Sequence, residues 1–322
     1  MHSWKQWALV LALLQCLATG QSAWSQTDST LRIMVPFTPG GGADSAARAV
    51  ARRLQVELGE TVVVENKPGA GGNIAFEQVA KSAPDGKTLV LATNSLVINP
   101  LLYPATRFDA VKSFTPVAML ARSPVLLLST NNVPVNTLPE LLAYIKARPG
   151  KLSYASCGNG SIHQLAGESL KASATLDMQH IPYKGCSAAM TDIAGGQVEL
   201  GMISITSAAS FIEAKRVKAF AITADKVSAL TPNLPTITSA GIANFAFDGW
   251  YALMAAAGTP PAIVSKLNTA INKALADEEL RKAFASAYLE PSTSSSTELG
   301  TFIESEVTRY GRIIKLSNIK GD

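Results

Sequence analysis

The chain has 322 residues, of which 47% are hydrophobic and 16% are charged, and its formal net charge is +4. This length is enough for one large or two medium domains, and the hydrophobic content excludes a disordered protein. The small positive charge is spread along the chain without a dense run of Lys or Arg, so nothing in it indicates a nucleic-acid partner.

The first 25 residues have the pattern of a secretory signal peptide. Lys5 precedes an apolar run over residues 7–18, and the small residues Ala23 and Ser25 then stand at the positions that a signal peptidase reads. The run is too short to span a bilayer comfortably. We therefore expect residues 1–25 to be removed, with a cut after Gly20 as the alternative, and the mature protein to be exported to a bacterial periplasm.

Short apolar runs that read as buried strands alternate with segments of helical periodicity along the rest of the chain. The helix after the first run ends at Gly59, a residue suited to a left-handed cap, and a later helix begins with Thr137 as its N-cap. This alternation predicts an α/β protein with mainly parallel sheets. The expected strands lie within residues 31–37, 61–66, 87–94, 125–130, 151–156, 178–183, 199–204 and 217–223.

The residues that follow these strands are mostly glycine, serine, threonine and asparagine. The first strand leads into TPGGGAD (residues 38–44) and the second into NKPGAGGN (residues 66–73). Ligands of parallel α/β sheets bind at the carboxyl ends of the strands, so we expect a cleft lined by backbone N–H groups and short hydroxyls. A glycine loop that opens a helix suits an anion, most naturally a carboxylate. The alternative is that the glycines only make tight turns.

Other uses of these loops have less support. The dinucleotide fingerprint needs a third glycine where Ile74 stands, and neither loop has the Gly-Lys-Ser/Thr of a phosphate-binding loop. The chain lacks the G-x-S-x-G motif of hydrolases. Cys157 and His163 are conceivable as nucleophile and base, but their spacing does not enforce contact. Since no metal-ligand spacing appears either, we expect no enzyme, no cofactor and no metal.

Two polar residues have a structural interpretation beside a ligand-binding one. Asp44 and Asn73 both stand where a helix is expected to begin, and Asp and Asn side chains cap the free N–H groups of helix starts. We expect Asp44 to be an N-cap rather than a catalytic group, and Asn73 to cap its own helix.

Cys157 and Cys186 are the cysteines that remain after export. Each follows an expected strand, with one helix between them, as in a β-α-β unit whose strands are neighbours. Their loops would then emerge side by side, within the distance that a disulfide requires. Because the periplasm is oxidising, we favour a disulfide that joins two walls of the cleft; two buried free thiols are the alternative.

Five stretches of the sequence are similar to one known family: VPFTPGGGADSAAR, VVENKPGAGGNIAFEQVAKSAPDGKTL, YASCGNGS, PYKGCSAAMTDIAGGQVEL and GTPPAIVSKLN. In this order, across essentially the whole mature chain, they resemble the Bug-type substrate-binding proteins, the periplasmic receptors of tripartite tricarboxylate transporters. The resemblance implies a small organic carboxylate held between two lobes and delivered to the membrane subunits of such a transporter. A sensor that signals to a membrane kinase is the alternative.

The resemblance also implies the domain organisation. It predicts a two-lobed periplasmic binding protein fold of the type II kind, in which residues 26–124 and 246–322 form lobe 1 and residues 125–245 form lobe 2. The chain would cross between the lobes near residues 121–126 and again near residues 242–250, with Trp250 packed at the hinge. We expect a monomer. Whether the ligand is a di- or tricarboxylate, an amino acid or an aromatic carboxylate stays open.

Matching the family's ligand-binding loops to this sequence gives a candidate site in both lobes. The chain departs from the family's pattern beside these loops: Ala75 replaces a glycine, Gln164 replaces a histidine, and GMISITS lacks a common aspartate. Lys184 is the obvious cation among the candidates. These are Phe37, Thr38, Pro39, Gly40, Gly41, Gly42, Asp44, Gly71, Gly72, Asn73, Thr93 and Asn94 in lobe 1, and Ser156, Gly158, Asn159, Gly160, Ser161, Tyr183, Lys184, Gly185 and Ser204 in lobe 2.

Overall fold

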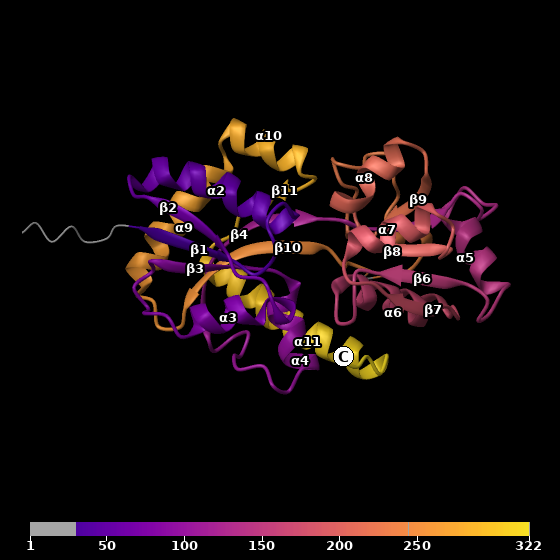
Figure 1. Ribbon diagram of the computed structural model, residues 1–322, viewed down its shortest axis with the longest axis horizontal. Helices are drawn as coiled ribbons and strands as arrows, with labels where there is room; N and C mark the ends of the chain where they lie inside the picture. Colours follow the sequence, from indigo (N-terminus) through magenta and orange to yellow (C-terminus); the bar gives the residue numbers. More distant parts are fainter. Residues whose placement is uncertain (1–29, 244, 322) are drawn as a thin grey trace, which may run out of the picture.

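The computed structural model describes residues 30–243 and 245–321 of the chain, so the expected signal peptide lies outside the described residues. Two lobes lie side by side, and each is a β-sheet with helices on its faces (Figure 1). This is the predicted two-lobed α/β architecture. Within the described residues, no helix combines the length and the apolar character needed to cross a membrane.

Lobe 1 contains a six-stranded sheet in the order β11-β4-β10-β3-β1-β2. Helices α2, α9 and α10 pack together on one face, and α11 packs with α4 near the other face, where α3 also lies (Figure 1). The strands are Leu31–Val35 (β1), Val62–Asn66 (β2), Thr88–Ala92 (β3), Phe114–Ser123 (β4), Gly249–Ala256 (β10) and Glu290–Pro291 (β11). The helices are Gly42–Leu58 (α2), Asn73–Ala80 (α3), Asn94–Leu102 (α4), Pro261–Leu275 (α9), Glu278–Ser286 (α10) and Ser296–Leu316 (α11), with a short 3-10 turn at Ala70–Gly72 (η1).

Lobe 2 contains a five-stranded sheet in the order β7-β6-β8-β5-β9. Helices α7 and α8 contact each other and cover one face of this sheet with a separate apolar cluster. The strands are Val125–Thr130 (β5), Ser153–Ser156 (β6), Gln179–Pro182 (β7), Leu200–Ser204 (β8) and Val217–Ile222 (β9). The helices are Leu138–Lys146 (α5), Ile162–Ala174 (α6), Cys186–Ala194 (α7) and Ile205–Glu213 (α8), with a 3-10 turn at Ile237–Ala240 (η2).

Both sheets are mixed, which corrects the expectation of mainly parallel sheets. Strand β1 is parallel to β2 and β3, and β6 is parallel to β7 and β8. Strand β10 is antiparallel to β3 and β4, and β5 is antiparallel to β8 and β9. The reason is the double crossing. Strands β5 and β10 each enter a lobe from the hinge and run away from the cleft, whereas β1, β3, β6 and β8 end at it.

The strands that the sequence analysis missed all belong to lobe 1 and lie beside the crossings or pair with a strand that does. Strands β4, β10 and β11 were not among the expected strands. The chain leaves the first sheet at Ser123 and enters the second at Val125, and it returns to the first sheet at Gly249. Just before this return, the Phe247 N–H still donates to the Thr223 carbonyl of lobe 2. These sheet limits lie beside the expected crossings, and the exact extents of the lobes stay a prediction.

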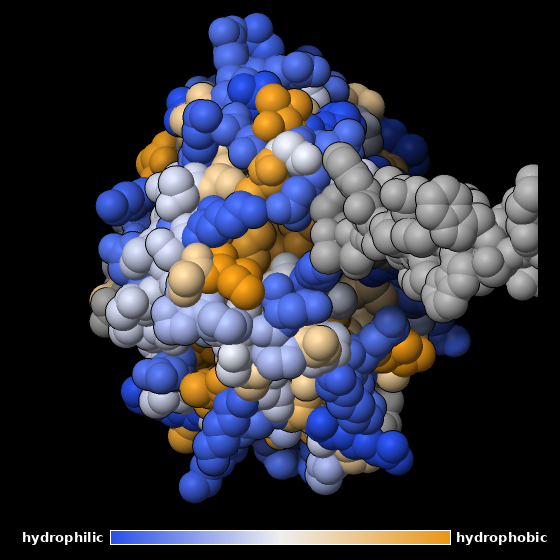
Figure 2. Space-filling view, turned by 90° about the vertical axis from the view of Figure 1, so that its left-hand side faces the viewer, coloured by the Kyte–Doolittle hydropathy of each residue, from blue (hydrophilic) through white to orange (hydrophobic). Residues whose placement is uncertain are grey.

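The end of lobe 1 farthest from lobe 2 is mostly polar. Figure 2 shows hydrophilic residues over most of this face, with small hydrophobic areas separated from one another. The edge strand β2 belongs to this lobe and carries the exposed side chain of Val63, and Val56 on α2 is exposed as well. The larger apolar surfaces of lobe 1 are instead buried on the two faces of its sheet.

Candidate functional site

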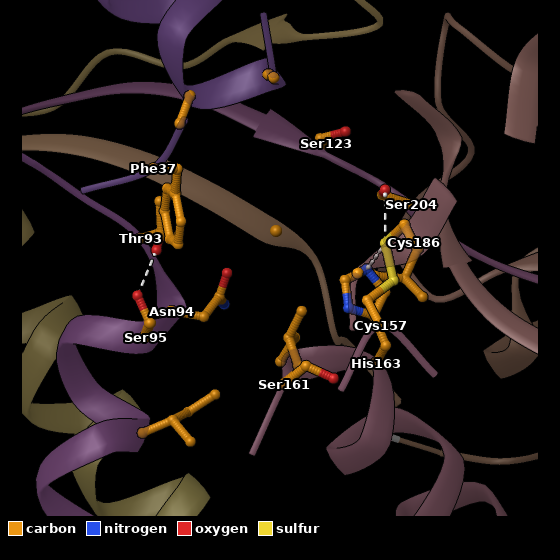
Figure 3. A pocket seen from close by; sticks show the side chains of 18 of the residues that line it. Phe37, Thr93, Asn94, Ser95, Ser123, Cys157, Ser161, His163, Cys186 and Ser204 are labelled. Atoms are coloured by element: carbon orange, nitrogen blue, oxygen red, sulfur yellow. Dashed lines mark hydrogen bonds between the residues drawn. A yellow bond between two sulfur atoms is a disulfide. The ribbon is translucent and has the colours of Figure 1, made fainter. Parts of the chain in front are cut away.

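A cavity of about 510 Å³ lies between the two lobes. In Figure 3, Phe37, Thr93 and Ser95 line the lobe 1 wall and face Cys157, Cys186 and Ser204 of lobe 2 across it. Two close contacts join the lobes beside the cavity. A Cβ atom on Gly42 would lie 3.7 Å from the Thr206 methyl, and one on Gly160 would lie 2.6 Å from a Leu102 methyl. The distance at Gly42 is an ordinary van der Waals contact, whereas the distance at Gly160 is too short for a Cβ atom, so glycine at position 160 lets the lobes approach closely.

The structure brings about half of the candidate residues together at this cavity. The remainder lie behind the lining or on the surface: Thr38, Pro39, Gly40, Asp44, Gly72, Asn73, Ser156, Gly158, Tyr183 and Lys184. Those that line the cavity are Phe37, Gly41, Gly42, Gly71, Thr93, Asn94, Asn159, Gly160, Ser161, Gly185 and Ser204, together with both cysteines.

Asp44 holds the first glycine loop in place, and the expectation that it is an N-cap is wrong. Helix α2 has Gly41 as its N-cap, and Asp44 lies in the first turn. The buried Asp44 carboxylate accepts hydrogen bonds from the Gly40 N–H (3.0 Å), Arg48 Nε (3.0 Å) and Asn66 Nδ2 (2.9 Å). Burial alone would raise the pKa of Asp44, but these donors hold it below its ordinary value. The side chain is therefore committed to the loop and not to the cavity.

Asn73 also stabilises the protein instead of capping a helix. The N-cap of α3 is Gly72, whose φ of 102° turns the chain into the helix in a conformation that favours glycine. Asn73 is the first helical residue, one position too late to cap. Its Oδ1 accepts a hydrogen bond from Asn99 Nδ2 at 2.6 Å, and its Nδ2 contacts Thr106 Oγ1 at 3.4 Å.

Asn94 connects the cavity wall to the hinge. Its Nδ2 donates to the Asp248 carbonyl (3.1 Å) and to the buried Tyr310 hydroxyl (2.9 Å), and its Oδ1 accepts from the Trp250 N–H (3.3 Å). The side chain thus fixes the start of β10. Trp250 itself is buried at the hinge, packs edge-to-face against Phe302 and also lines the cavity.

The loop after β6 is held by its own hydrogen bonds. Ser161 caps α6 by accepting from the Gln164 N–H, and the Gly160 N–H donates to Gln164 Oε1 at 2.7 Å. His180 contacts Ser156 Oγ at 2.7 Å and Gln164 Nε2 at 3.2 Å, and its burial lowers its pKa to about 4. Gln164, where the family pattern has histidine, therefore acts by shaping the cleft loop.

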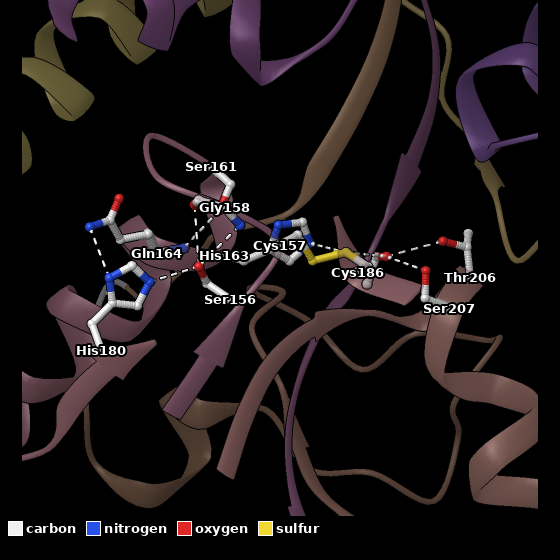
Figure 4. The surroundings of a disulfide bond; sticks show 11 residues. Ser156, Cys157, Gly158, Ser161, His163, Gln164, His180, Cys186, Thr206 and Ser207 are labelled. Carbon is white, nitrogen blue, oxygen red and sulfur yellow. Dashed lines mark hydrogen bonds between the residues drawn. A yellow bond between two sulfur atoms is a disulfide. The ribbon is translucent and has the colours of Figure 1, made fainter. Parts of the chain in front are cut away.

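Cys157 and Cys186 form the expected disulfide, with Cα atoms 4.3 Å apart. The bond lies in the lobe 2 wall, with His163 Nε2 3.7 Å from Cys186 Sγ (Figure 4). Together these three residues have a spacing that could suit a metal ion. Both sulfurs are joined to each other, however, so neither offers the thiolate that a metal or a nucleophilic mechanism needs.

No described residue that lines the cavity is an Asp, Glu, Lys or Arg. Burial lowers the pKa of His163 to about 4 and raises that of Tyr251 to about 12, so both lining side chains are neutral near pH 7. Lys184 is exposed and lies outside the lining, and the Tyr183 hydroxyl turns away to donate to Asp192. The polar groups that face the cavity are therefore hydroxyls, amides and backbone.

The first turns of several helices open on this cavity without a capping side chain. The N-cap residues Gly41 (α2), Thr93 (α4), Gly185 (α7) and Ser204 (α8) all line it, and none makes a side-chain capping bond. A helix start leaves up to four N–H groups without an intrahelical partner and carries a partial positive charge. Without a charged side chain, the cavity can therefore still attract an anion.

Sequence reasoning missed several lining residues. Ser123, Gly249 and Tyr251 were missed as candidates because strands β4 and β10 were missed, whereas Trp250 was expected at the hinge, with stacking on an aromatic ligand as the alternative. A usable signal existed for another set: Ser95, Thr206 and Ser207 lie in the first turn of helices that follow expected strands. The other residues that line the cavity are Ala43, Ile98, Asn99, Val125, Ile162 and His163.

Two α/β lobes that are joined by two crossings and enclose a cavity define a solute-binding receptor, and similar solved structures support this class. Periplasmic binding protein BugD superimposes with a TM-score of 0.77 at 32% identity, over 91% of this chain and 99% of BugD. Rpa4515 of R. palustris, solved with adipate, gives a TM-score of 0.79 at 32% identity, over 90% of this chain and 98% of Rpa4515.

The family follows from the sequence match. The model of the tripartite tricarboxylate transporter family receptor matches residues 46–319, so the chain belongs to this family. Protein BugT of Bordetella pertussis is 34% identical over 308 residues, which cover 94% of both chains. The predicted membership is confirmed, and this family is a class of solute-binding receptors.

Proposed function

We propose that this receptor captures a small organic carboxylate in the periplasm and delivers it to the membrane subunits of a tripartite tricarboxylate transporter. The observation that carries the proposal is the pair of uncapped helix starts in lobe 1, those of α2 and α4, which open on a cavity with no charged side chain among its described lining. Free N–H groups at helix starts bind carboxylates through charge-assisted hydrogen bonds. We assign Gly41, Gly42 and Thr93 to the primary carboxylate site.

The relatives support the ligand class and the compartment. Rpa4515 was solved with adipate, a carboxylate, and BugD is a periplasmic binding protein. The N-terminal sequence pattern is that of an exported chain. Capture and release require no proton transfer, so a receptor can work with two neutral histidines and a disulfide where an enzyme would need a reactive side chain.

A proline substitution tests the role of the α2 start. Gly42→Pro removes one N–H group at the first helical position, where proline is tolerated because this N–H lacks an intrahelical partner. The preceding Gly41 is already extended, at φ −82° and ψ 172°, as a residue before proline must be. Gly42→Ala is the matched control, because a Cβ atom at this position would lie 2.9 Å from the Tyr251 hydroxyl in both variants, whereas the alanine variant keeps the N–H group.

Calorimetry on unfolded and refolded protein, with a panel of aliphatic and aromatic carboxylates, measures the effect. We expect Gly42→Pro to bind the best ligand roughly tenfold or more weakly than Gly42→Ala does, which is the value of one charge-assisted hydrogen bond. If no carboxylate in the panel binds native refolded protein, the proposed ligand class is wrong. Loss of carboxylate uptake on deletion of the gene tests the transport role.

A further inference from the structure

A segment of lobe 1 contacts lobe 2 away from the two crossings. Residues 288–290 connect α10 with β11, which pairs with β4 in the lobe 1 sheet. The Tyr288 hydroxyl donates to Glu213 Oε1 at the end of α8, at 2.8 Å, and the Tyr288 ring packs against the apolar cluster of lobe 2 (Figure 1). Ser228 of lobe 2 also donates to the Glu290 carboxylate. These contacts join two lobes whose sheets share no strand pairing.

Tyr288 stands where the end of a helix commonly has glycine. It comes two residues after the end of α10, and its φ of 54° lies in the left-handed region. Its N–H donates to the Ala285 carbonyl and the Leu289 N–H donates to the Phe284 carbonyl, which is the hydrogen-bond pattern of a Schellman motif. Gly59 ends α2 in the same left-handed conformation without strain, whereas a bulky side chain is strained there.

The backbone around Tyr288 is fixed to lobe 1. Leu289 is 1% exposed and packs in a lobe 1 core cluster. The Tyr288 carbonyl accepts a hydrogen bond from Ser123 Oγ at 3.2 Å, and Ser123 lines the ligand cavity. Among the described residues other than glycine, five have a positive φ, and Tyr288 is the aromatic one. Lobe 1 therefore holds a strained residue in place, and the side chain of that residue contacts lobe 2.

Helix α8 connects this contact with the ligand cavity. The helix has nine residues, of which Glu213 is the last, and Thr206 and Ser207 at its start line the cavity. A helix of about two and a half turns moves as one body, so a rotation of lobe 2 that closes the cavity also moves Glu213 relative to Tyr288. Glu213 is exposed and Tyr288 is partly buried, so the two side chains can separate without opening a core.

We propose that Tyr288 is a latch for the closed arrangement of the lobes: its contact with α8 forms when the cavity closes and breaks when it opens. The strain at position 288 supports this role, because glycine would relieve it and tyrosine offsets it only through its side chain. A contact made only in the closed state raises ligand affinity and slows release, since the ligand leaves through the open state. The latch does not depend on which ligand the cavity takes.

Two substitutions separate the latch from a permanent structural contact. Tyr288→Gly removes the side chain and the strain together, whereas Tyr288→Phe keeps the ring and the strain and removes the hydroxyl. Tyr183→Phe is the matched control, because the Tyr183 hydroxyl donates to the Asp192 carboxylate at 2.6 Å within lobe 2. The probe ligands are succinate, adipate, benzoate and terephthalate, and calorimetry and stopped-flow fluorescence measure their affinities and rates on refolded protein.

The expected effects differ between the liganded and the unliganded protein. We expect Tyr288→Gly to weaken the best probe at least about tenfold and Tyr288→Phe about threefold, through faster dissociation with association rates within about twofold of native. Tyr183→Phe should change neither rate. Without ligand, Tyr288→Gly should melt within about 2 °C of the native protein, because the open form lacks the contact and the relieved strain offsets the added freedom of the unfolded chain.

Three results would overturn the inference while the proposed function survives. They are native affinity in both Tyr288 variants, an equal loss of affinity in Tyr183→Phe, and an unliganded Tyr288→Gly variant that melts more than about 2 °C below the native protein, as a permanent contact requires. If none of the four acids binds the native refolded protein, the proposed ligand class is wrong, and the melting temperatures of the unliganded variants then decide on the latch.

Discussion

Two groups of helix starts in this protein differ in how their free N–H groups are satisfied. Helices α5, α10 and α11 begin away from the cavity, and each has a side-chain cap: Thr137, Asp277 and Ser295. Helices α2, α4, α7 and α8 begin at the cavity and have none. Helix α9 is uncapped as well, but it begins with Pro260 and Pro261, which have no N–H to satisfy. Helix α3 is an exception to this difference, because its N-cap Gly72 lies behind the cavity lining and the helix has no side-chain cap.

The difference shows where the fold retains unsatisfied donors. An N-cap side chain stabilises a protein by about 1 kcal/mol, so four uncapped starts represent stability that the unliganded protein lacks. A bound anion supplies the missing acceptors, and ligand binding then stabilises the folded state by mass action. Helix α6 is intermediate, because its cap Ser161 also lines the cavity.

The disulfide gives the largest expected effect among the tests of this comparison. It fixes the uncapped start of α7 to the loop after β6 and closes a loop with a sequence separation of 29. Replacement of Cys157 and Cys186 by serine should lower the free energy of unfolding by about 3–4 kcal/mol, measured by denaturant titration. A loss below 1 kcal/mol would mean that the two loops hold their positions without the bond.

Asn94 gives the second largest expected effect. It is the first residue of the uncapped helix α4, and its buried side chain holds other elements in place. Asn94→Ala removes hydrogen bonds to Asp248, Trp250 and Tyr310 and should cost about 2–3 kcal/mol in the same titration. Ser95→Ala is the matched control, since among the described residues the Ser95 hydroxyl has Thr93 Oγ1 as its hydrogen-bond partner, and it should cost less than about 0.5 kcal/mol. Equal losses would contradict the hinge role of Asn94.

A pair of serine substitutions tests the comparison directly. Ser295→Ala removes the capping box of α11 and should cost about 1 kcal/mol of stability, with no change in ligand affinity. Ser204→Ala removes no capping bond and should cost less than about 0.5 kcal/mol in the absence of ligand, but it should reduce the stabilisation that a bound carboxylate gives. Thermal melts with and without ligand separate the two effects. If Ser204→Ala melts as early as Ser295→Ala without ligand, the two groups of helix starts do not differ.

The smallest expected effect is that of pH on affinity. His163 has a pKa of about 4 because it is buried, so it stays neutral from pH 8 down to about pH 5.5. If helix starts supply the positive potential, carboxylate affinity should change by less than about twofold over this range. A charged His163 would instead make binding tighten steeply below pH 6.5. Isothermal titrations at several pH values distinguish the two.

The free energy of unfolding should also depend on the protonation of His163. The folded pKa of His163 lies below the ordinary value of 6.5, so the unfolded chain takes up the proton first as pH falls. The contribution of His163 therefore destabilises the protein progressively from about pH 6.5 down to about pH 4.

Local sequence signals predicted much of the fold and part of the site. The alternation of strands and helices, the glycine loops and the disulfide follow from short-range patterns and chain order. Strand β10 did not, because Gly249–Ala256 contains three alanines, a leucine and a methionine, which favour helices locally. Its pairing with β3 and β4, more than a hundred residues away in the sequence, overrides that preference.

The roles of single polar residues were harder to predict. Asp44 and Asn73 have the right identity and place for an N-cap or a ligand contact, and the sequence alone does not separate these roles. Their partners, Arg48 and Asn66 for one and Asn99 and Thr106 for the other, lie on other elements or other turns and become neighbours only in the fold.

The reliance on helix starts has a consequence for how such receptors diversify. A backbone N–H belongs to every residue except proline, so most substitutions at Gly41, Thr93 or Ser204 preserve the groups that attract an anion. The side chains between the two walls, such as Phe37 and Ile98, are free to vary in size and shape. Substitutions in the middle of the cavity can therefore change which carboxylate binds, while the backbone groups that bind the charged end are retained.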